Sequence, residues 1–255
     1  MPYANNAGVR IHYEVEGAGP PLVLQTGLSG RIENWRSLGY VSALRDDYRL
    51  ILIDARGHGQ SDKPHDGASF AFDRVVADVI AVLDALGVER AHYWGYSMGG
   101  RTGFGMAKFA PTRVNGLIIG GAHPYGGPGG GEFYESLKYG IAHGRDALIA
   151  RMEELSGQPI PDAYAKDLRE GDLEAWLAIA GQPRENLGSM LDHMAMPCCI
   201  YAGDADGAFA NAKLASTRIP NARFFSLPGL DHLQAIFSAS DKVLPRVKDF
   251  LATVR

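Results

Sequence analysis

Six short apolar segments, separated by longer amphipathic ones, constrain the fold of this chain more than any other feature. Each is bounded by turn residues and nearly free of charge, as fully buried parallel strands are. They are LVLQ at 22–25, LILID at 50–54, AHYWGY at 91–96, LIIGG at 117–121, CCIYAG at 198–203 and ARFFSLP at 222–228. Because strands that alternate with helices form a sheet covered on both faces, the pattern predicts an α/β protein with a doubly wound, mostly parallel sheet.

The segments between these strands carry helical periodicity. In FDRVVADVIAVLDAL, residues 72–86, valine, isoleucine and leucine recur on one helical face, and Gly87 follows as a C-cap. An alternating segment, VRIHYEV at 9–15, ends in EGAGPP and is expected to form an antiparallel edge strand. Further helices are expected over 98–109, 209–218 and 233–251.

The alternation breaks once, between residues 124 and 196, where helical pieces follow one another without a clear buried strand. We therefore expect a core formed by 1–123 and 197–255, with an all-helical insertion at 124–196. The length of 255 residues fits one large α/β domain with an insertion, or two small domains. Within the insertion, the glycine-rich segment 126–131 is interpreted as a hinge or loop rather than a phosphate-binding loop.

Composition narrows the classes of partner. The net charge is −4 and no basic run occurs, so nucleic acid and anionic membranes are not expected partners. No apolar run approaches the roughly 20 residues that span a bilayer, and the N-terminus has no secretory signal pattern, so we expect a cytoplasmic protein. Cys198 and Cys199 lie together in an apolar run and are expected to be reduced thiols, with no metal site implied.

The stretch YWGYSMGG, residues 93–100, places a serine between two glycines. In a chain with 32 glycines such a match has little weight alone, so its context decides. A predicted strand runs directly into Ser97 and a predicted helix runs directly out, which requires a strained φ > 0 at the serine and small residues at Gly95 and Gly99. Ser97 is therefore a candidate nucleophile at the carboxyl end of the sheet.

A serine nucleophile needs a base, and the base needs an acid to orient it. His232 follows the last predicted strand and precedes the C-terminal helix, which puts it at the same end of the sheet as Ser97. The preceding strand ends in GDAD, so Asp204 and Asp206 are both candidate acids.

With these residues the sequence resembles the α/β-hydrolase family over nearly its whole length. GYSMGG is similar to the family's nucleophile elbow, LPGLDHL to its histidine segment, and GDAD to its G-x-x-D acid loop, which implies Asp206 as the acid. DARGHGQSD at 54–62 resembles a family loop in which Asp54, Arg56 and His58 are expected to brace neighbouring loops. The resemblance implies a sheet of the eight-stranded type. It also implies a helical cap, here 124–196, inserted after the sixth strand.

The resemblance also implies an oxyanion hole formed by the backbone N–H groups of Leu28 and Met98. The family usually has a histidine where this chain has Thr26, in LQTGLSG, so the bonding that holds this loop is expected to differ. Trp35 is expected to pack the loop and is also a candidate for the substrate pocket. The other pocket candidates, in the insertion, are Tyr125, Tyr134 and Trp176.

A serine nucleophile disfavours the family's dehalogenase and epoxide hydrolase reactions, which need a carboxylate. The first hypothesis is hydrolysis of a small carboxylic ester or lactone through an acyl-serine, without metal or cofactor. Carbon–carbon bond hydrolysis and perhydrolysis by the same triad are alternatives within enzymes. A low-turnover, receptor-like binding role is the alternative from another class. The sequence indicates neither the particular substrate nor the oligomeric state.

Overall fold

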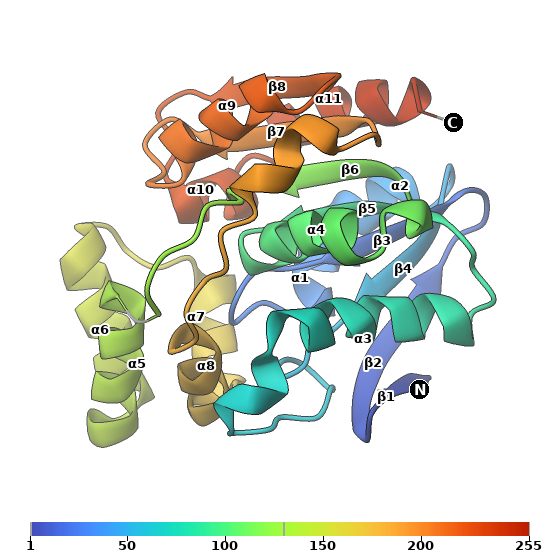
Figure 1. Cartoon of the computed structure of the whole chain (residues 1–255). Helices are drawn as coiled ribbons and strands as arrows, with labels where there is room; N and C mark the ends of the chain where they lie inside the picture. The colour runs from blue at the N-terminus through green and yellow to red at the C-terminus, as the bar shows by residue number, and fades with distance from the viewer. Residues whose placement is uncertain (1, 130, 255) are drawn as a thin grey trace.

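A computed structural model of the chain describes residues 2–129 and 131–254, so residue 130 of the glycine-rich segment 126–131 lies outside the described residues. The strands form one eight-stranded sheet in the order β1-β2-β4-β3-β5-β6-β7-β8 (Figure 1). β1 and β2 pair antiparallel, as do β2 and β4, and the remaining neighbours are parallel. The strands are β1 (Tyr3–Asn6), β2 (Val9–Glu16), β3 (Pro21–Gln25), β4 (Arg49–Ile53), β5 (Ala91–Tyr96), β6 (Val114–Gly120), β7 (Cys198–Gly203) and β8 (Ala222–Leu227). The predicted α/β class and doubly wound, mostly parallel sheet are confirmed.

The edge of the sheet differs from the prediction. The segment 9–15 is a strand, but it lies second from the edge because Tyr3–Asn6 pairs outside it. Ala7 and Gly8, both at positive φ, form the two-residue turn between these strands. The sequence YANN is short and poor in strand-forming residues, so its pairing depends on this hairpin turn rather than on its own pattern.

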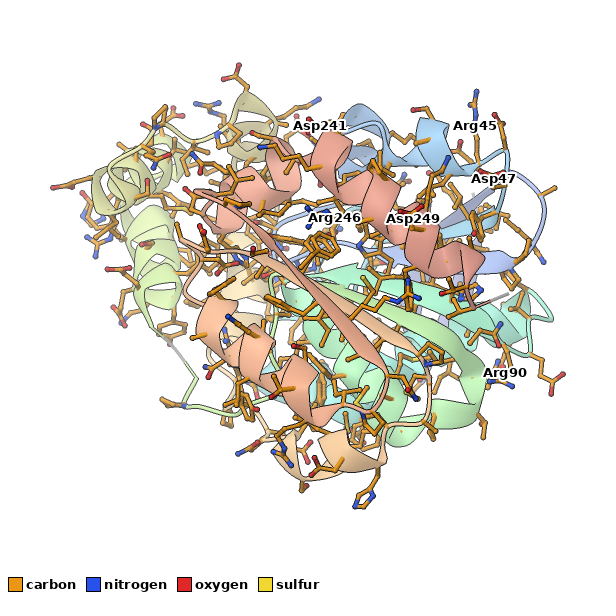
Figure 2. The ribbon with its side chains drawn as sticks, turned by 90° about the horizontal axis from the view of Figure 1, so that it is seen from above. Arg45, Asp47, Arg90, Asp241, Arg246 and Asp249 are labelled. Carbon is orange, nitrogen blue, oxygen red and sulfur yellow. The ribbon has the colours of Figure 1, made fainter. Side chains whose placement is uncertain are left out.

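Helices cover both faces of the sheet and bury a separate apolar cluster on each. One face carries α3 (Phe72–Ala85), α4 (Met98–Phe109) and α9 (Phe209–Arg218). The other carries α1 (Ile32–Ser37), α2 (Tyr40–Leu44) and α11 (Ser240–Ala252). Figure 2 shows Asp241 and Asp249 on α11, and an ion pair of 3.4 Å between Lys248 Nζ and Asp47 Oδ2 joins this helix to the turn that follows α2.

The helix expected over 233–251 is in fact two helices. α10 (His232–Phe237) and α11 are separated at Ser238 and Ala239. The break lets Leu233 and Phe237 of α10 pack toward the inserted helices, while Val243 and Val247 of α11 pack on the sheet. A single straight helix would not reach both apolar surfaces.

The inserted helices follow β6, the sixth strand (Figure 1), and their apolar side chains form a third cluster. They are α5 (Glu132–His143), α6 (Arg145–Ser156), α7 (Asp162–Glu170) and α8 (Leu173–Ala180). The insertion is not helical to its end, as the expectation for 124–196 required. Arg184 forms an extended bridge with Gly127, and a 3-10 turn, η3 (Gly188–His193), follows it. Leu187 and Leu191 of this stretch pack in the cluster of the sheet rather than with the inserted helices.

Two further 3-10 turns, η1 (Gly67–Phe70) and η2 (Pro111–Arg113), precede α3 and β6. Within the described ranges, no helix combines the length and the apolarity that crossing a membrane requires.

Candidate active site

Ser97 lies on the turn between β5 and α4 with φ 53° and ψ −113°, a positive φ that non-glycine residues rarely adopt. The turn is this tight because backbone groups approach closely on both sides. A Cβ at Gly95 would lie 2.1 Å from the Gly99 carbonyl oxygen, and one at Gly99 would lie 2.3 Å from the Gln25 carbonyl oxygen. The strained serine and the need for glycine at both flanking positions are therefore as the sequence predicts.

Three side chains from three loops meet at the carboxyl end of the sheet. His232 Nε2 lies 2.9 Å from Ser97 Oγ, and His232 Nδ1 lies 2.7 Å from Asp206 Oδ2. Because a carboxylate only accepts hydrogen bonds, Nδ1 carries the proton and Nε2 presents its lone pair to the Ser97 hydroxyl. The structure thus brings together the serine, histidine and acid expected from the sequence.

Asp206 and Asp204 differ in what they reach. The Asp206 side chain is 3% exposed, and its Oδ1 accepts the Ala208 N–H at 2.8 Å while Oδ2 faces the histidine. Asp204 is exposed, and its Oδ1 accepts the Gly229 N–H at 2.6 Å. Asp206 is therefore the carboxylate that orients His232.

Tyr96 contacts His232 through both its hydroxyl and its ring. Its hydroxyl donates to the His232 carbonyl oxygen at 2.6 Å, and its ring centroid lies 5.3 Å from the imidazole. Burial raises the pKa of Tyr96 well above its ordinary value, so the hydroxyl keeps its proton and stays a donor. This residue was not among those predicted, and its position directly before Ser97, at the end of a buried strand, is the only sequence signal for it.

The loop after β3 packs directly on Ser97. A Cβ at Gly27 would lie 2.9 Å from Ser97 Cβ, and the Thr26 carbonyl accepts the Gly99 N–H at 3.1 Å. Met98 is the first residue of α4, where a backbone N–H has no partner within the helix. Across the described part of the chain, neither the Leu28 N–H nor the Met98 N–H donates a hydrogen bond. Both amides are thus without a partner among the described residues: Met98 directly follows Ser97, and Leu28 directly follows Gly27, which packs on the serine.

The loop is held without the histidine that Thr26 replaces. The Tyr93 hydroxyl contacts both the Gln25 side-chain oxygen and the Gly99 carbonyl, which ties the end of β3 to the start of α4. On its other side, the Ser29 N–H donates to His58 Nε2 at 2.9 Å.

The segment 54–62 braces these loops, as interpreted from the sequence. The Asp54 carboxylate accepts the Ile32 N–H at 3.0 Å and lies 2.8 Å from His12 Nδ1. Arg56 and Asp78 form a buried ion pair that anchors the segment to α3. These contacts lie below the surface and take no part in the serine, histidine and aspartate chain.

The four pocket candidates occupy different surroundings. Trp35 does not line a pocket: it is fully buried, edge-on to Tyr40 and Trp94 in the cluster under the sheet, because α1 turns its indole into the core. Tyr125 packs against the cluster of the opposite face, and Tyr134 is half-buried on α5 with Lys138 over its ring. Trp176 stacks on His58 and lines a cavity of about 50 Å³ beside Ser29.

Cys198 and Cys199 are free and buried in β7, and burial raises the pKa of each thiol to about 12. Among residues 2–129 and 131–254, no three His, Cys, Asp or Glu side chains gather closely enough to hold a metal ion.

Known proteins share this architecture. A family model described as the alpha/beta hydrolase fold matches residues 20–128. The putative carbamate hydrolase RutD of Azorhizobium caulinodans is 38% identical over 119 residues, which are 47% of this chain but only 43% of that protein. A putative 2-succinyl-6-hydroxy-2,4-cyclohexadiene-1-carboxylate synthase of Bacillus subtilis is 26% identical over 87% of this chain and 88% of its own length.

Among solved structures, the enol-lactonase from Burkholderia xenovorans LB400 matches with a TM-score of 0.83 and 23% identity, over 98% of this chain and 100% of that one. The sheet order, the strained serine turn and the family model agree. The chain has the α/β-hydrolase fold.

Proposed function

We propose that this protein is a serine hydrolase that cleaves a small carboxylic ester or lactone through an acyl-Ser97 intermediate. One observation carries the proposal: the continuous hydrogen-bonded chain from Ser97 Oγ through His232 to Asp206, with distances of 2.9 and 2.7 Å. A serine hydroxyl is a weak nucleophile until a neighbouring base removes its proton, and His232 Nε2 is in position to do so.

In the acylation step, Ser97 Oγ attacks the substrate carbonyl carbon while His232 Nε2 takes the hydroxyl proton. The carbonyl π electrons move onto oxygen, and the free N–H groups of Leu28 and Met98 stabilise that oxyanion. Asp206 stabilises the imidazolium that forms. The oxyanion then collapses, the bond from carbon to the leaving oxygen breaks, and His232 returns its proton to the leaving alcohol.

In the deacylation step, His232 removes a proton from water, and the hydroxide attacks the acyl carbon. The second oxyanion collapses with release of Ser97, which recovers its proton from His232. For a lactone the leaving hydroxyl remains attached to the acyl chain, so one product is released instead of two. His232 accepts and returns the proton in each step, so the scheme needs no metal or cofactor.

The names of similar proteins support acyl chemistry without defining the substrate. One is named a carbamate hydrolase and another an enol-lactonase, and both names describe cleavage at an acyl carbon. Another relative is named a synthase, so the names alone do not define the reaction. Esters and lactones are therefore tested directly. Residues 124–196, which contain α5 to α8, are proposed as the cap that selects the substrate.

The test is hydrolysis of p-nitrophenyl esters from acetate to decanoate, alongside a lactone panel, by wild type and Ser97→Ala. We expect turnover of short-chain substrates and a loss of roughly 10⁴-fold or more in the variant, which keeps the fold. A Ser97→Ala protein with near-normal kcat would contradict the assignment. A stoichiometric release of p-nitrophenol without turnover would instead indicate the binding role.

A further inference from the structure

Ser29 follows the proposed oxyanion donor Leu28 in an unusual conformation. Its φ is +68°, in the left-handed region that favours glycine, and its side chain is buried. A non-glycine residue stays in this region only where its surroundings hold it there. Leu28 and Ser29 are the two central residues of a turn in which the Gly30 N–H donates to the Gly27 carbonyl at 3.1 Å, so a group that holds the Ser29 backbone also holds the turn that carries the Leu28 amide.

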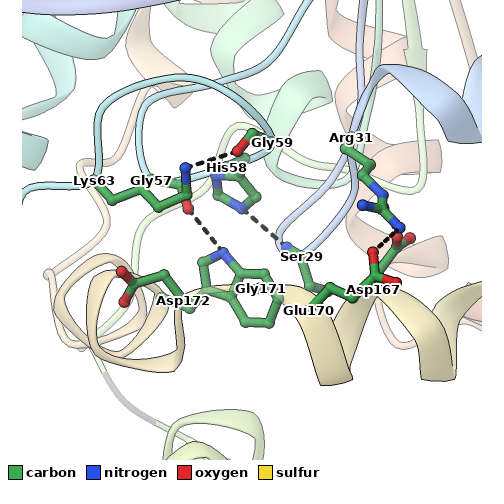
Figure 3. Close-up of a pocket in the computed structure, with 11 residues that line it drawn as sticks. Ser29, Arg31, Gly57, His58, Gly59, Lys63, Asp167, Glu170, Gly171 and Asp172 are labelled. Carbon is green, nitrogen blue, oxygen red and sulfur yellow. Dashed lines mark hydrogen bonds and ion pairs between the residues drawn. The ribbon is translucent and has the colours of Figure 1, made fainter.

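The His58 side chain contacts the Ser29 backbone directly (Figure 3). Its Nε2 lies 2.9 Å from the Ser29 backbone nitrogen, and its Nδ1 lies 3.0 Å from the Arg56 carbonyl oxygen. A carbonyl only accepts, so Nδ1 carries the proton and Nε2 accepts the Ser29 N–H. Burial lowers the pKa of His58 to about 4, which keeps the ring a neutral acceptor at ordinary pH.

His58 is in turn fixed from two sides. Arg56, whose carbonyl it contacts, is tied to Asp78 by a buried ion pair. From the inserted helix α8, the Trp176 ring stacks on the imidazole with centroids 5.8 Å apart and planes 28° apart. Trp176 Nε1 also donates to the Gly57 carbonyl at 3.1 Å. These contacts hold the imidazole in the orientation in which Nε2 faces the Ser29 N–H.

We propose that His58 is a positioning residue for the proposed hydrolase: by accepting the Ser29 N–H, it holds the turn that aims the Leu28 amide at the oxyanion. This inference rests on the proposed function, because the oxyanion exists only in that reaction. His58 touches no reacting atom. Its contribution is made in the transition state, where the loop must already be in place.

The experiment measures kcat and KM of His58→Leu on a p-nitrophenyl ester, with kcat expressed per active site titrated by a fluorophosphonate. We expect kcat to fall roughly 10- to 100-fold with KM nearly unchanged. Loss of the contact between His58 and the Ser29 N–H weakens the hydrogen bond from the Leu28 N–H, which is made only with the oxyanion. His58→Gln places an amide oxygen near the position of Nε2 and is expected to recover part of kcat.

His92→Leu is the matched control, because His92 is also a buried histidine but lies near the start of β5, where its ring packs edge-on to Tyr48. It is expected to keep the wild-type kcat per site. Should His58→Leu fail to fold, His58→Gln is compared with His58→Asn, whose shorter side chain does not reach Ser29 and should lose more. Wild-type kcat per site in His58→Leu, or an equal fall in His92→Leu, overturns the proposal.

Hydrogen exchange of a peptide spanning residues 26–31 separates this inference from the proposed function. A wild type that hydrolyses no ester or lactone refutes the proposed function but leaves this readout intact. Faster exchange at 26–31 in His58→Leu than in His92→Leu then supports the hold on the loop. Equal exchange in the two variants refutes it.

Discussion

Asp204 and Asp206 show that the role of an aspartate depends on which group its side chain can contact. Asp204 and Asp206 both follow β7, yet Asp206 is buried against His232 while Asp204 accepts the Gly229 N–H at the surface. From the residues alone the two were equivalent candidates, and the family resemblance pointed to Asp206. Their separation depends on the turn of the backbone after the strand, which composition does not encode.

We expect Asp206→Asn to lower kcat by roughly 10⁴-fold, because an amide at this position no longer stabilises the imidazolium and favours the wrong tautomer of His232. Asp204→Asn keeps an oxygen that can accept the Gly229 N–H, so its kcat should stay within a few-fold of wild type. Steady-state kinetics of the two variants side by side provides the measurement. The opposite ranking would move the role of the acid to Asp204.

Trp35 marks the limit of residue-level prediction. An aromatic side chain near a predicted oxyanion loop suits a pocket wall and a core position equally well. Trp35 lies in the core because helix α1, which was not predicted, turns the indole into the cluster with Tyr40 and Trp94.

At the scale of elements, the turn from β5 to α4 positions Ser97 at the carboxyl end of the sheet. The bounds of β5 and α4 match the prediction, because a buried apolar run, two glycines and a regular helix agree locally. β1 was missed because its short sequence has no strand pattern and its pairing depends on a two-residue turn. The break between α10 and α11 was missed because it is imposed by packing against the inserted helices, which are distant in the sequence.

Gly99→Ala tests the tightness of this turn. Its Cβ would lie 2.3 Å from the Gln25 carbonyl oxygen and 2.6 Å from the Thr26 carbonyl oxygen, so the oxyanion loop must move. We expect a loss of about 1–3 kcal/mol in the free energy of unfolding, together with a lower kcat per titrated site. Denaturant unfolding and active-site titration measure the two effects.

Gly127→Ala is the control, because a Cβ there meets nothing within 4 Å. Its stability should lie within about 0.5 kcal/mol of wild type. If Gly99→Ala were as stable and active as Gly127→Ala, the turn would not be as constrained as the geometry indicates.

At the scale of the whole molecule, the site is assembled from the loops after β3, β5, β7 and β8, and the inserted helices touch the first of them. Asn34 Nδ2 donates to the buried Asp167 of α7 at 2.7 Å, and Arg31 Nε lies 2.7 Å from the same carboxylate. The alternation of strands and helices predicted the sheet, since that pattern repeats locally. These contacts join residues more than 130 positions apart and leave no local pattern, so they were not predicted.

The most direct test of the account is to trap the acyl-enzyme. Wild-type protein is mixed with p-nitrophenyl acetate, quenched in acid within milliseconds and examined by intact mass and peptide mapping, with Ser97→Ala treated in the same way. The account predicts one acetyl group on the peptide that carries Ser97, formed together with the burst of p-nitrophenol and absent from the variant. Turnover by wild type with the acetyl group on another residue, and equal hydrolysis by Ser97→Ala, would contradict it.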